Sequence, residues 1–481
     1  MQDRFNTAVL ILQQHCFSSE YTNANTKMFT YCVRRRVLQI CLQSSNYCSR
    51  CALQLSRAHS TQESESDLTT TLLKLCADRS FIAPGEVHTR ALRHGNSCSY
   101  GPLGKDLKKN ILDQWWNSIT RSKAQVFGID TLQHVPNDAG SLKLVDTSAF
   151  GQIINNKDLT KSQVVDRLQQ LLHHSSSVRT NLLQGALEQC LPSLELVKRK
   201  LPFGLAETGV CHQLLDQNKA AIGCSSERTE ASLVWFCSPR TASQWLDHWT
   251  RQRLKWWRKF ALSPSDFSSS DVVEAELQGG ASRGVQVTYR FPWGSEPLET
   301  LWNLGESELL KTHGNARAKL QCKDGRKLVV PHVVAVNGNM DRGVLAYLFN
   351  SLQLEKKGSG KQRIHQRKVL KLHPTLAPVK VALDMGKGAT MELRQVCEGL
   401  LTEFLEADIS VWPGYLEPQT LDQLHTKYDE MGVLFTVMIS ENTLENGLLL
   451  VRNRDSTIRE TMHISEVKTY LQKYINAAEN I

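Results

Sequence analysis

Arg342 lies where an arginine side chain could grip an anion. It follows a β-branched run at residues 329–336 and the turn Asn337, Gly338 and Asn339. Apolar residues then recur at helical spacing, so the stretch predicts a strand, a glycine turn and a helix. Backbone N–H groups at such a turn, with an arginine beside them, can hold a phosphate. Most turns of this kind bind nothing, so the rest of the chain must decide what this one does.

A second group of cations lies at residues 354–371, where seven basic residues stand against the single acid Glu355. Lysine and arginine side chains that meet phosphates release counterions, so such a segment can bind a duplex backbone without reading its sequence. The alternative is a solvated linker between two domains. The expected DNA contacts are Lys356, Lys357, Lys361, Arg363, Arg367 and Lys368.

Residues 157–200 carry two apolar stripes at helical spacing, separated by three serines. Thr160 and Gln163 have the form of a capping box at the first helix start. The pattern predicts a helical hairpin, and pairing with a second copy would cover its apolar faces in a four-helix bundle. The alternative is that the hairpin folds back on its own domain. The expected dimer contacts are Val164, Leu168, Leu171, Leu172, Val178, Leu182 and Ala186.

Other segments are predicted to form the helices and strands that position these residues. Helical spacing at residues 103–119 and strand-like residues at 229–236 predict core elements. Residues 245–260 interleave aromatic and basic side chains; we interpret the aromatics as core and the charges as a solvated face, with nucleic-acid contact as the alternative. The last 110 residues alternate strands and helices and predict a separate α/β domain. We expect a first domain at 64–353 and a second at 372–481.

The composition is that of a globular protein, with 41% hydrophobic and 22% charged residues and a net charge of +9. Its 481 residues allow two or three domains. No apolar run approaches the roughly 20 residues that a membrane helix needs, so we expect no membrane span. The 13 cysteines show no pair of C-x-x-C motifs at zinc spacing, so we predict neither metal nor disulfides.

The amino-terminal segment has a targeting composition. Residues 21–62 contain no Asp or Glu but six Lys or Arg residues, among many Ser and Gln. This pattern is typical of a mitochondrial presequence, which we place at residues 1–60, with Met28 as a possible start. A disordered basic tail is the alternative.

Five blocks of the sequence resemble glycyl-tRNA synthetases. They lie, in order, at residues 99–116 (SYGPLGKDLKKNILDQWW), 302–313, 330–348, 376–383 and 429–455. The resemblance implies the α/β fold of a class II aminoacyl-tRNA synthetase, an antiparallel sheet with flanking helices. A carboxyl-terminal anticodon-binding-like α/β domain would follow it.

The departures from that family concern its catalytic residues. A Phe-Arg-x-Glu strand should follow residues 201–210 (LPFGLAETGV), but Cys211, His212, Gln213 and Leu214 stand there. The family's arginine holds the ATP α-phosphate, and losing one such donor typically costs about 10²–10³ in rate. Arg342 survives, and His212 is at best a weak substitute because imidazole cannot make a bidentate fork. We therefore expect a vestigial nucleotide site at His212 and Arg342, no cofactor and no enzyme activity.

A synthetase-like body without its catalytic residues, with a presequence and a basic segment, resembles the accessory subunits of mitochondrial replicative DNA polymerases. Residues 253–271 (RLKWWRKFALSPSDFSSSD), 291–294 and 367–374 carry this resemblance. It implies a homodimer in the mitochondrial nucleoid that binds the catalytic subunit and duplex DNA and raises processivity. The alternatives are a mitochondrial glycyl-tRNA synthetase-like enzyme and a stand-alone tRNA-binding protein.

Overall fold

A computed structural model describes residues 68–84, 98–121, 125–135, 142–214, 225–357 and 365–479, apart from 274, 276, 278, 279, 387–389 and 418. Residues 69–481 form one compact unit. The presequence expected at residues 1–60 lies outside the described residues.

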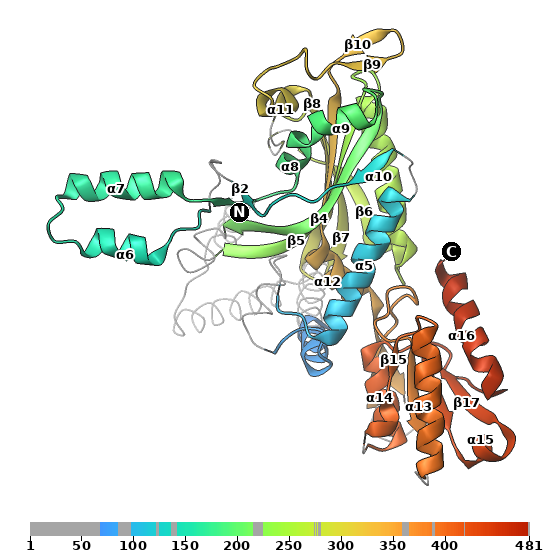
Figure 1. Cartoon of the computed structure of the whole chain (residues 1–481). Helices are drawn as coiled ribbons and strands as arrows, with labels where there is room; N and C mark the ends of the chain where they lie inside the picture. Colours follow the sequence, from blue (N-terminus) through green and yellow to red (C-terminus); the bar gives the residue numbers. More distant parts are fainter. Residues whose placement is uncertain are drawn as a thin grey trace, which may run out of the picture. The chain divides into compact units, whose positions relative to one another are not determined.

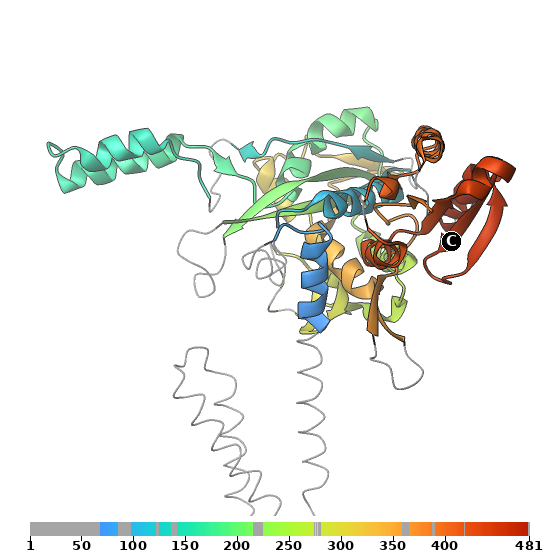
Figure 2. The same ribbon diagram turned by 90° about the horizontal axis from the view of Figure 1, so that it is seen from below.

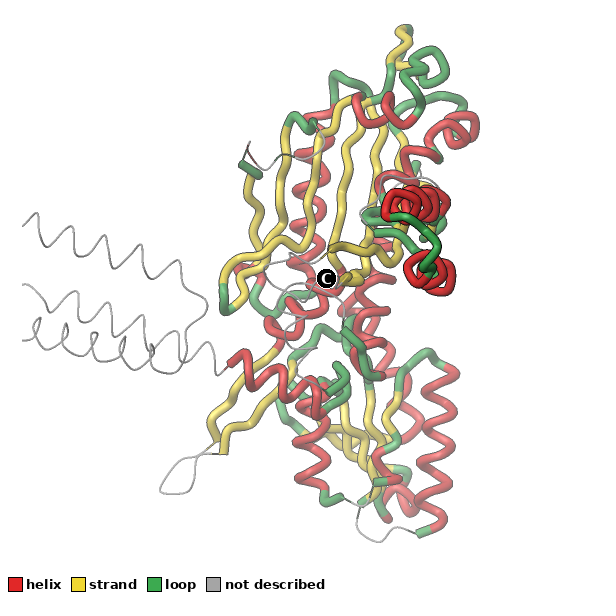
Figure 3. The backbone as a smooth tube through the Cα atoms, turned by 90° about the vertical axis from the view of Figure 1, so that its left-hand side faces the viewer, coloured by secondary structure: helices red, strands yellow, loops and turns green. Residues whose placement is uncertain are grey.

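A seven-stranded sheet forms the centre of the part of the chain that precedes β12 (Leu352–Lys357) (Figures 1 and 3). Its neighbours are antiparallel except for the β1/β4 pair, which is parallel. The predicted strand before Arg342 is β11, which pairs with β5 on one side and β8 on the other. In sheet order, the strands are β1 (Val126–Gly128), β4 (Phe203–Leu214), β5 (Ser225–Cys237), β11 (His332–Asn339), β8 (Gly294–Gly305), β7 (Arg283–Phe291) and β6 (Phe267–Asp271).

Long helices cover one face of this sheet and short helices cover the other. Successive residues of a strand point to opposite faces, so each strand contributes side chains to both cores. Val334 and Val336 of β11 join the core shared with α5 (Pro102–Thr120), α10 (Ala242–Lys259) and α12 (Met340–Ser351). Val333 and Ala335 face the opposite core, which includes residues of α8 (Leu183–Glu188), α9 (Cys190–Leu196) and α11 (Ser307–Thr312). A small hairpin of β9 (Cys322–Asp324) and β10 (Lys327–Val329) contributes Cys322 to that second core.

Helix α10 confirms the core interpretation of its aromatic residues, since Trp249, Trp256 and Phe260 are buried. It also buries a charge that the sequence did not single out. Arg253 donates to both carboxylate oxygens of Glu299, at 2.9 Å from Nε to Oε2 and 3.0 Å from Nη2 to Oε1. Trp115 Nε1 donates to the same carboxylate at 2.8 Å, so the cluster ties α10, β8 and α5 together.

The helical hairpin exists, but its arms differ from the prediction. It is formed by α6 (Thr147–Asn155) and α7 (Lys161–His174), with the predicted capping box at Thr160, and neither helix buries a residue. It stands clear of the sheet (Figures 1 and 2). The stripe predicted for the second arm, which includes Val178, Leu182 and Ala186, is instead buried in this chain. Val178 lies in β3 (Ser177–Val178), which pairs with β2 (His134–Val135).

The carboxyl-terminal part of this unit contains a five-stranded sheet of order β15-β14-β16-β17-β18. The sequence pattern predicts a helix at 421–431, which matches α14 at both ends. It also predicts a turn at 445–447, which instead overlaps the end of a short helix, α15. Strand β18 was not predicted. Strand bounds are β14 (Val381–Met385), β15 (Val411–Trp412), β16 (Phe435–Ile439), β17 (Leu448–Asn453) and β18 (Arg459–His463). Helix bounds are α13 (Met391–Glu406), α14 (Leu421–Met431), α15 (Glu441–Asn446) and α16 (Ile464–Glu479).

The basic segment at 354–371 is largely a β-hairpin. Strands β12 (Leu352–Lys357) and β13 (His365–Leu370) pair antiparallel from Leu352–Leu370 to Lys357–His365. Lys361 and Arg363 fall between them, outside the described residues. The expected loop is therefore mostly an extension built on paired strands.

Candidate functional site

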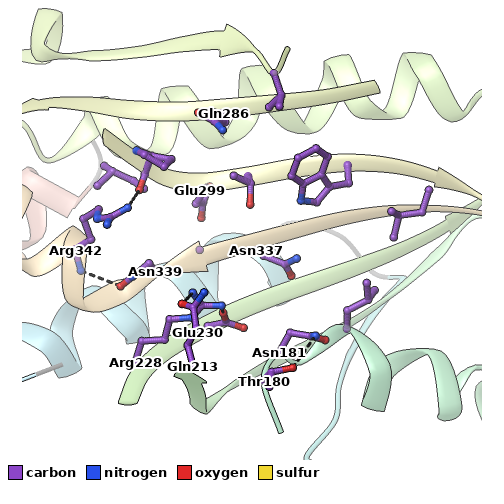
Figure 4. A pocket seen from close by; sticks show the side chains of 18 of the residues that line it. Thr180, Asn181, Gln213, Arg228, Glu230, Gln286, Glu299, Asn337, Asn339 and Arg342 are labelled. Carbon is purple, nitrogen blue, oxygen red and sulfur yellow. Dashed lines mark hydrogen bonds and ion pairs between the residues drawn. The ribbon is translucent and has the colours of Figure 1, made fainter. Parts of the chain in front are cut away.

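A polar cavity of about 810 Å³ opens on the face of the seven-stranded sheet near the start of α12. Figure 4 shows side chains from β4, β5, β7, β8 and β11 pointing into it, with Arg342 at one end. Amides and hydroxyls supply much of the lining. Those polar residues are Thr180, Asn181, Gln213, Gln286, Thr300, Asn337 and Asn339.

Arg342 lines this cavity as predicted, but its charge is already engaged. Asn339 caps α12, its Oδ1 accepting from the backbone N–H of Arg342 at 3.0 Å. The guanidinium forms an ion pair with Glu296 at 3.1 Å and donates to the carbonyl of Pro297 at 3.0 Å. Burial lowers the pKa of Arg342; Glu296 opposes this shift, and the nearby Arg228 adds to it.

Arg228 is the second cation of the cavity, and sequence reasoning missed it. It forms an ion pair with Glu230 and donates from Nη1 to Oε1 of Gln213 at 2.7 Å. Strand register accounts for the contact, because Cys211 of β4 lies opposite Arg228 of β5 and side chains on one face repeat every second residue. An acidic neighbour two residues along a strand is the signal that could have revealed the pair.

His212 is not among the residues that line the cavity. It lies between Cys211 and Gln213 on β4, so its side chain points to the opposite face of the sheet. We therefore leave His212 out of the vestigial nucleotide site and put Gln213, a neutral side chain, in its place.

The cavity can hold a polar ligand but is poorly equipped to stabilise a triphosphate. Among the lining residues that the structure describes, Arg228 and Arg342 are the basic ones, and each already has a carboxylate partner. Freeing either arginine for a phosphate would leave its partner carboxylate unpaired, which carries a substantial cost in a partly buried site. The cavity therefore contains two arginines whose charges are balanced by neighbouring carboxylates.

The expected DNA contacts fall into three groups. Arg367 is held by Asp429 at 2.8 Å and by Glu355 at 2.7 Å, so it fixes β13 to α14 rather than facing a ligand. Lys368 is half-buried on β13, and the backbones of Lys356 and Lys357 belong to β12. Lys361 and Arg363 lie outside the described residues. We remove Arg367 from the proposed contact set.

The expected dimer contacts fall into two groups, those that a partner could reach and those that this chain already buries. Val164, Leu168 and Leu171 are half-buried on α7 and Leu172 is exposed, so a partner could cover them. Val178, Leu182 and Ala186 are covered by this chain and are not available to a partner. The other arm, α6, adds exposed Phe150 and Ile154, which the prediction omitted.

Two kinds of feature are absent from the described part of the chain. It contains no group of three or more His, Cys, Asp or Glu side chains arranged to hold a metal ion. Nor does any helix there have the length and apolar character required to cross a bilayer.

Comparison with solved structures supports the class of fold. The structure superposes on prolyl-tRNA synthetase from Cryptosporidium parvum with a TM-score of 0.60, covering 85% of this chain and 75% of that one at 13% identity. A family profile described as "Anticodon binding domain" matches residues 379–474. Sequence comparison finds glycine–tRNA ligase of Borreliella burgdorferi at 25% identity, over 78% of this chain and 91% of the relative. Fold and site thus define a class II aminoacyl-tRNA synthetase-like body with an anticodon-binding-type domain.

Nearer relatives carry a different name. The chain is 50% identical to DNA polymerase subunit gamma-2 of Mus musculus over 421 residues, which cover 85% of this chain and 91% of the relative. It is 49% identical to "DNA polymerase subunit gamma-2, mitochondrial" of Xenopus laevis over 85% of this chain and 88% of the relative. The chain belongs to the DNA polymerase subunit gamma-2 family.

Proposed function

We propose that this protein is a non-catalytic processivity subunit that binds the catalytic subunit of mitochondrial DNA polymerase gamma and duplex DNA as a homodimer. Its family supports the polymerase role. The observation that carries the non-catalytic part is the neutralised cavity, where Glu230 and Glu296 occupy the two arginines. We further propose that the protein acts in the nucleoid of the mitochondrial matrix; the name of the Xenopus laevis relative supports the mitochondrion.

The hairpin α6–α7 would be the dimer interface. Four of its apolar residues are exposed in the described chain, namely Phe150, Ile154, Val165 and Leu172. Two such hairpins packed together would bury these faces in a four-helix arrangement. A twofold interface of this kind uses the same patch on both copies.

The β12–β13 extension would contact the DNA backbone through Lys356, Lys357, Lys361, Arg363 and Lys368. The anticodon-binding-type domain would dock the catalytic subunit, and it offers exposed apolar side chains at Met391, Leu405 and Leu416. Holding polymerase and template at two contacts raises the effective concentration of each for the other. Modest separate affinities then give a long residence on DNA.

Primer extension on a long template, with a trap that prevents rebinding, tests this proposal. We expect the wild-type protein to lengthen the products of the catalytic subunit. In one variant, Lys356, Lys357, Lys361 and Arg363 are replaced by alanine. This variant should stop lengthening the products at a lower salt concentration than the wild-type protein does. Each lost phosphate contact should also reduce the salt slope of binding by about 0.9. Unchanged product length on adding the wild-type protein would refute the processivity role. If the variant and the wild-type protein responded to salt identically, the β12–β13 hairpin would be a linker and not a DNA contact.

A stand-alone tRNA-binding protein is the remaining non-enzymatic rival. It would bind tRNA in preference to duplex DNA, with or without the catalytic subunit. Competition between the two nucleic acids separates that role from ours.

A further inference from the structure

A second group of cations lies on the synthetase-like body, remote in sequence from β12 and β13. It joins the end of α9 to the β9–β10 hairpin, two elements that lie close together in Figure 1. We call it the α9–β9 cluster. Its members, all exposed, are Lys198, Lys200, Lys319, Lys323, Arg326 and Lys327.

Backbone contacts hold the two segments of the cluster side by side. The N–H of Lys323 donates to the carbonyl of Arg199 at 2.8 Å, and Lys200 forms a β-bridge with Lys323. The Arg199 side chain donates to the carbonyls of Lys319 and Gln321, at 2.8 and 3.2 Å. Arg199 thus acts as a bracket that links the two segments by hydrogen bonds, and the fold itself brings the surrounding lysines together.

The acids around the cluster are otherwise occupied. Glu195 pairs with Arg199 at 2.7 Å, and Asp324 accepts a hydrogen bond from Ser238 Oγ at 2.6 Å. Among the described residues, no carboxylate forms an ion pair with any of the six cluster members. Like charges on neighbouring segments repel one another, and a bound anion would relieve that repulsion.

The backbone under the cluster is also strained. Lys198 and Arg199 are consecutive non-glycine residues at positive φ, 53° and 54°. Lysine and arginine rarely adopt this left-handed region. The conformation is fixed by the Arg199 N–H, which donates to the carbonyl of Leu194 at 2.8 Å, and by the bracket described above. Strain that a fold maintains at an exposed charged site is a reason to look for a ligand there.

We propose that the α9–β9 cluster is a second contact for the backbone of duplex DNA. This inference rests on the proposed function, which supplies the duplex. Five of the six members are lysines, which act as point charges on phosphates rather than as bidentate readers of bases. The segments that carry them present no Phe, Tyr or Trp on which unpaired bases could stack, which disfavours a single strand.

The test uses equilibrium binding of the full chain to a labelled blunt duplex at several salt concentrations. The variant K198Q/K200Q/K323Q removes three cluster charges while keeping polar side chains. The control K105Q/K109Q/K473Q removes three exposed charges from α5 and α16. We expect the cluster variant to lower the magnitude of the salt slope by about 2–3 and the control to leave it near the wild-type value.

Each outcome separates this inference from the proposed function. Equal slopes for wild type, variant and control would overturn the cluster as a DNA contact while leaving DNA binding intact. A wild-type protein that does not bind duplex at all would instead refute the proposed DNA contact. Loss of tRNA binding with unchanged duplex binding would make the cluster an RNA site and also overturn the inference.

Lys198→Gly adds an internal check, because glycine adopts positive φ without strain. We expect this variant to melt at a higher temperature yet to lower the salt slope by about 1. Weaker DNA binding by a more stable protein could not be attributed to unfolding. A higher melting temperature with an unchanged slope would count against the proposal.

Discussion

The double replacement Phe150→Glu and Leu172→Glu is expected to convert the proposed homodimer into a monomer. The two side chains lie on α6 and α7 and are about half exposed in the single chain, at 44% and 45%. In the proposed bundle both would be covered by the partner. Burying an unpaired carboxylate costs several kcal/mol, so the dissociation constant should rise by on the order of 10³-fold or more. Sedimentation equilibrium over a range of concentrations measures the change.

A matched control adds the same charge to the hairpin, with both changes on α7. Gln169→Glu with Gln170→Glu changes exposed residues of α7 outside its apolar stripe, and should leave the dimer intact. Because α6 and α7 bury no residue of their own chain, neither pair of changes should unfold the body. If the Phe150→Glu/Leu172→Glu variant remained dimeric, the hairpin would be excluded as the interface. A monomeric wild-type protein would exclude the dimer itself.

Arg253→Leu is expected to lower the free energy of unfolding by about 3–5 kcal/mol, because it leaves Glu299 buried without its cation. The side chains of Arg253 and Glu299 are 2% and 0% exposed. Only the Trp115 indole would remain as a described donor to the carboxylate. Urea denaturation followed by tryptophan fluorescence gives the change in the midpoint.

Two comparison variants show whether the loss of stability comes from the buried, unpaired carboxylate of Glu299. Arg283 forms ion pairs with Asp247 and Asp271 but is 43% exposed, so Arg283→Leu should cost at most about 1 kcal/mol. Adding Glu299→Leu to Arg253→Leu should recover part of the loss, since an apolar pair needs no compensation. Equal costs for the two arginine replacements would show that the buried cluster does not hold α5, α10 and β8 together.

Elements with a strong local signal could be predicted from the sequence. Helix α14 begins after the capping box at Thr420 and ends at Gly432, whose φ of 74° is a conformation that glycine favours. Helix α5 buries Leu107, Ile111 and Trp115 at the predicted spacing. In both cases the residues that decide the element lie within it or directly beside it.

The hairpin could not be placed correctly, for a physical reason. Apolar spacing shows that a face must be covered but not by what. The stripe that includes Leu182 and Ala186 is covered by the sheet of its own chain, while α6 supplies the second arm of the hairpin. Arg367 is a similar case, because its partner Asp429 is 62 residues away and leaves no local trace in the sequence.

The candidate site was predicted in part. Resemblance to the synthetases located both Arg342 and the segment where the motif arginine is lost. It could not show that Arg228 of β5 contacts Gln213 of the neighbouring strand β4. Nor could it show that Glu296, 46 positions before Arg342, neutralises the Arg342 charge. Strand alternation also removes His212 from the cavity, which becomes evident only once the register of β4 is known.

Glycine-dependent exchange between pyrophosphate and ATP tests the central claim most directly, because it reports adenylate formation without requiring tRNA. With both cavity arginines held by carboxylates, we predict no exchange above background from the purified protein, under conditions where a glycyl-tRNA synthetase is active. The catalytic subunit should still extend primers further when the same preparation is added. Exchange that depends on glycine and disappears in Arg342→Ala would contradict the account and establish a synthetase.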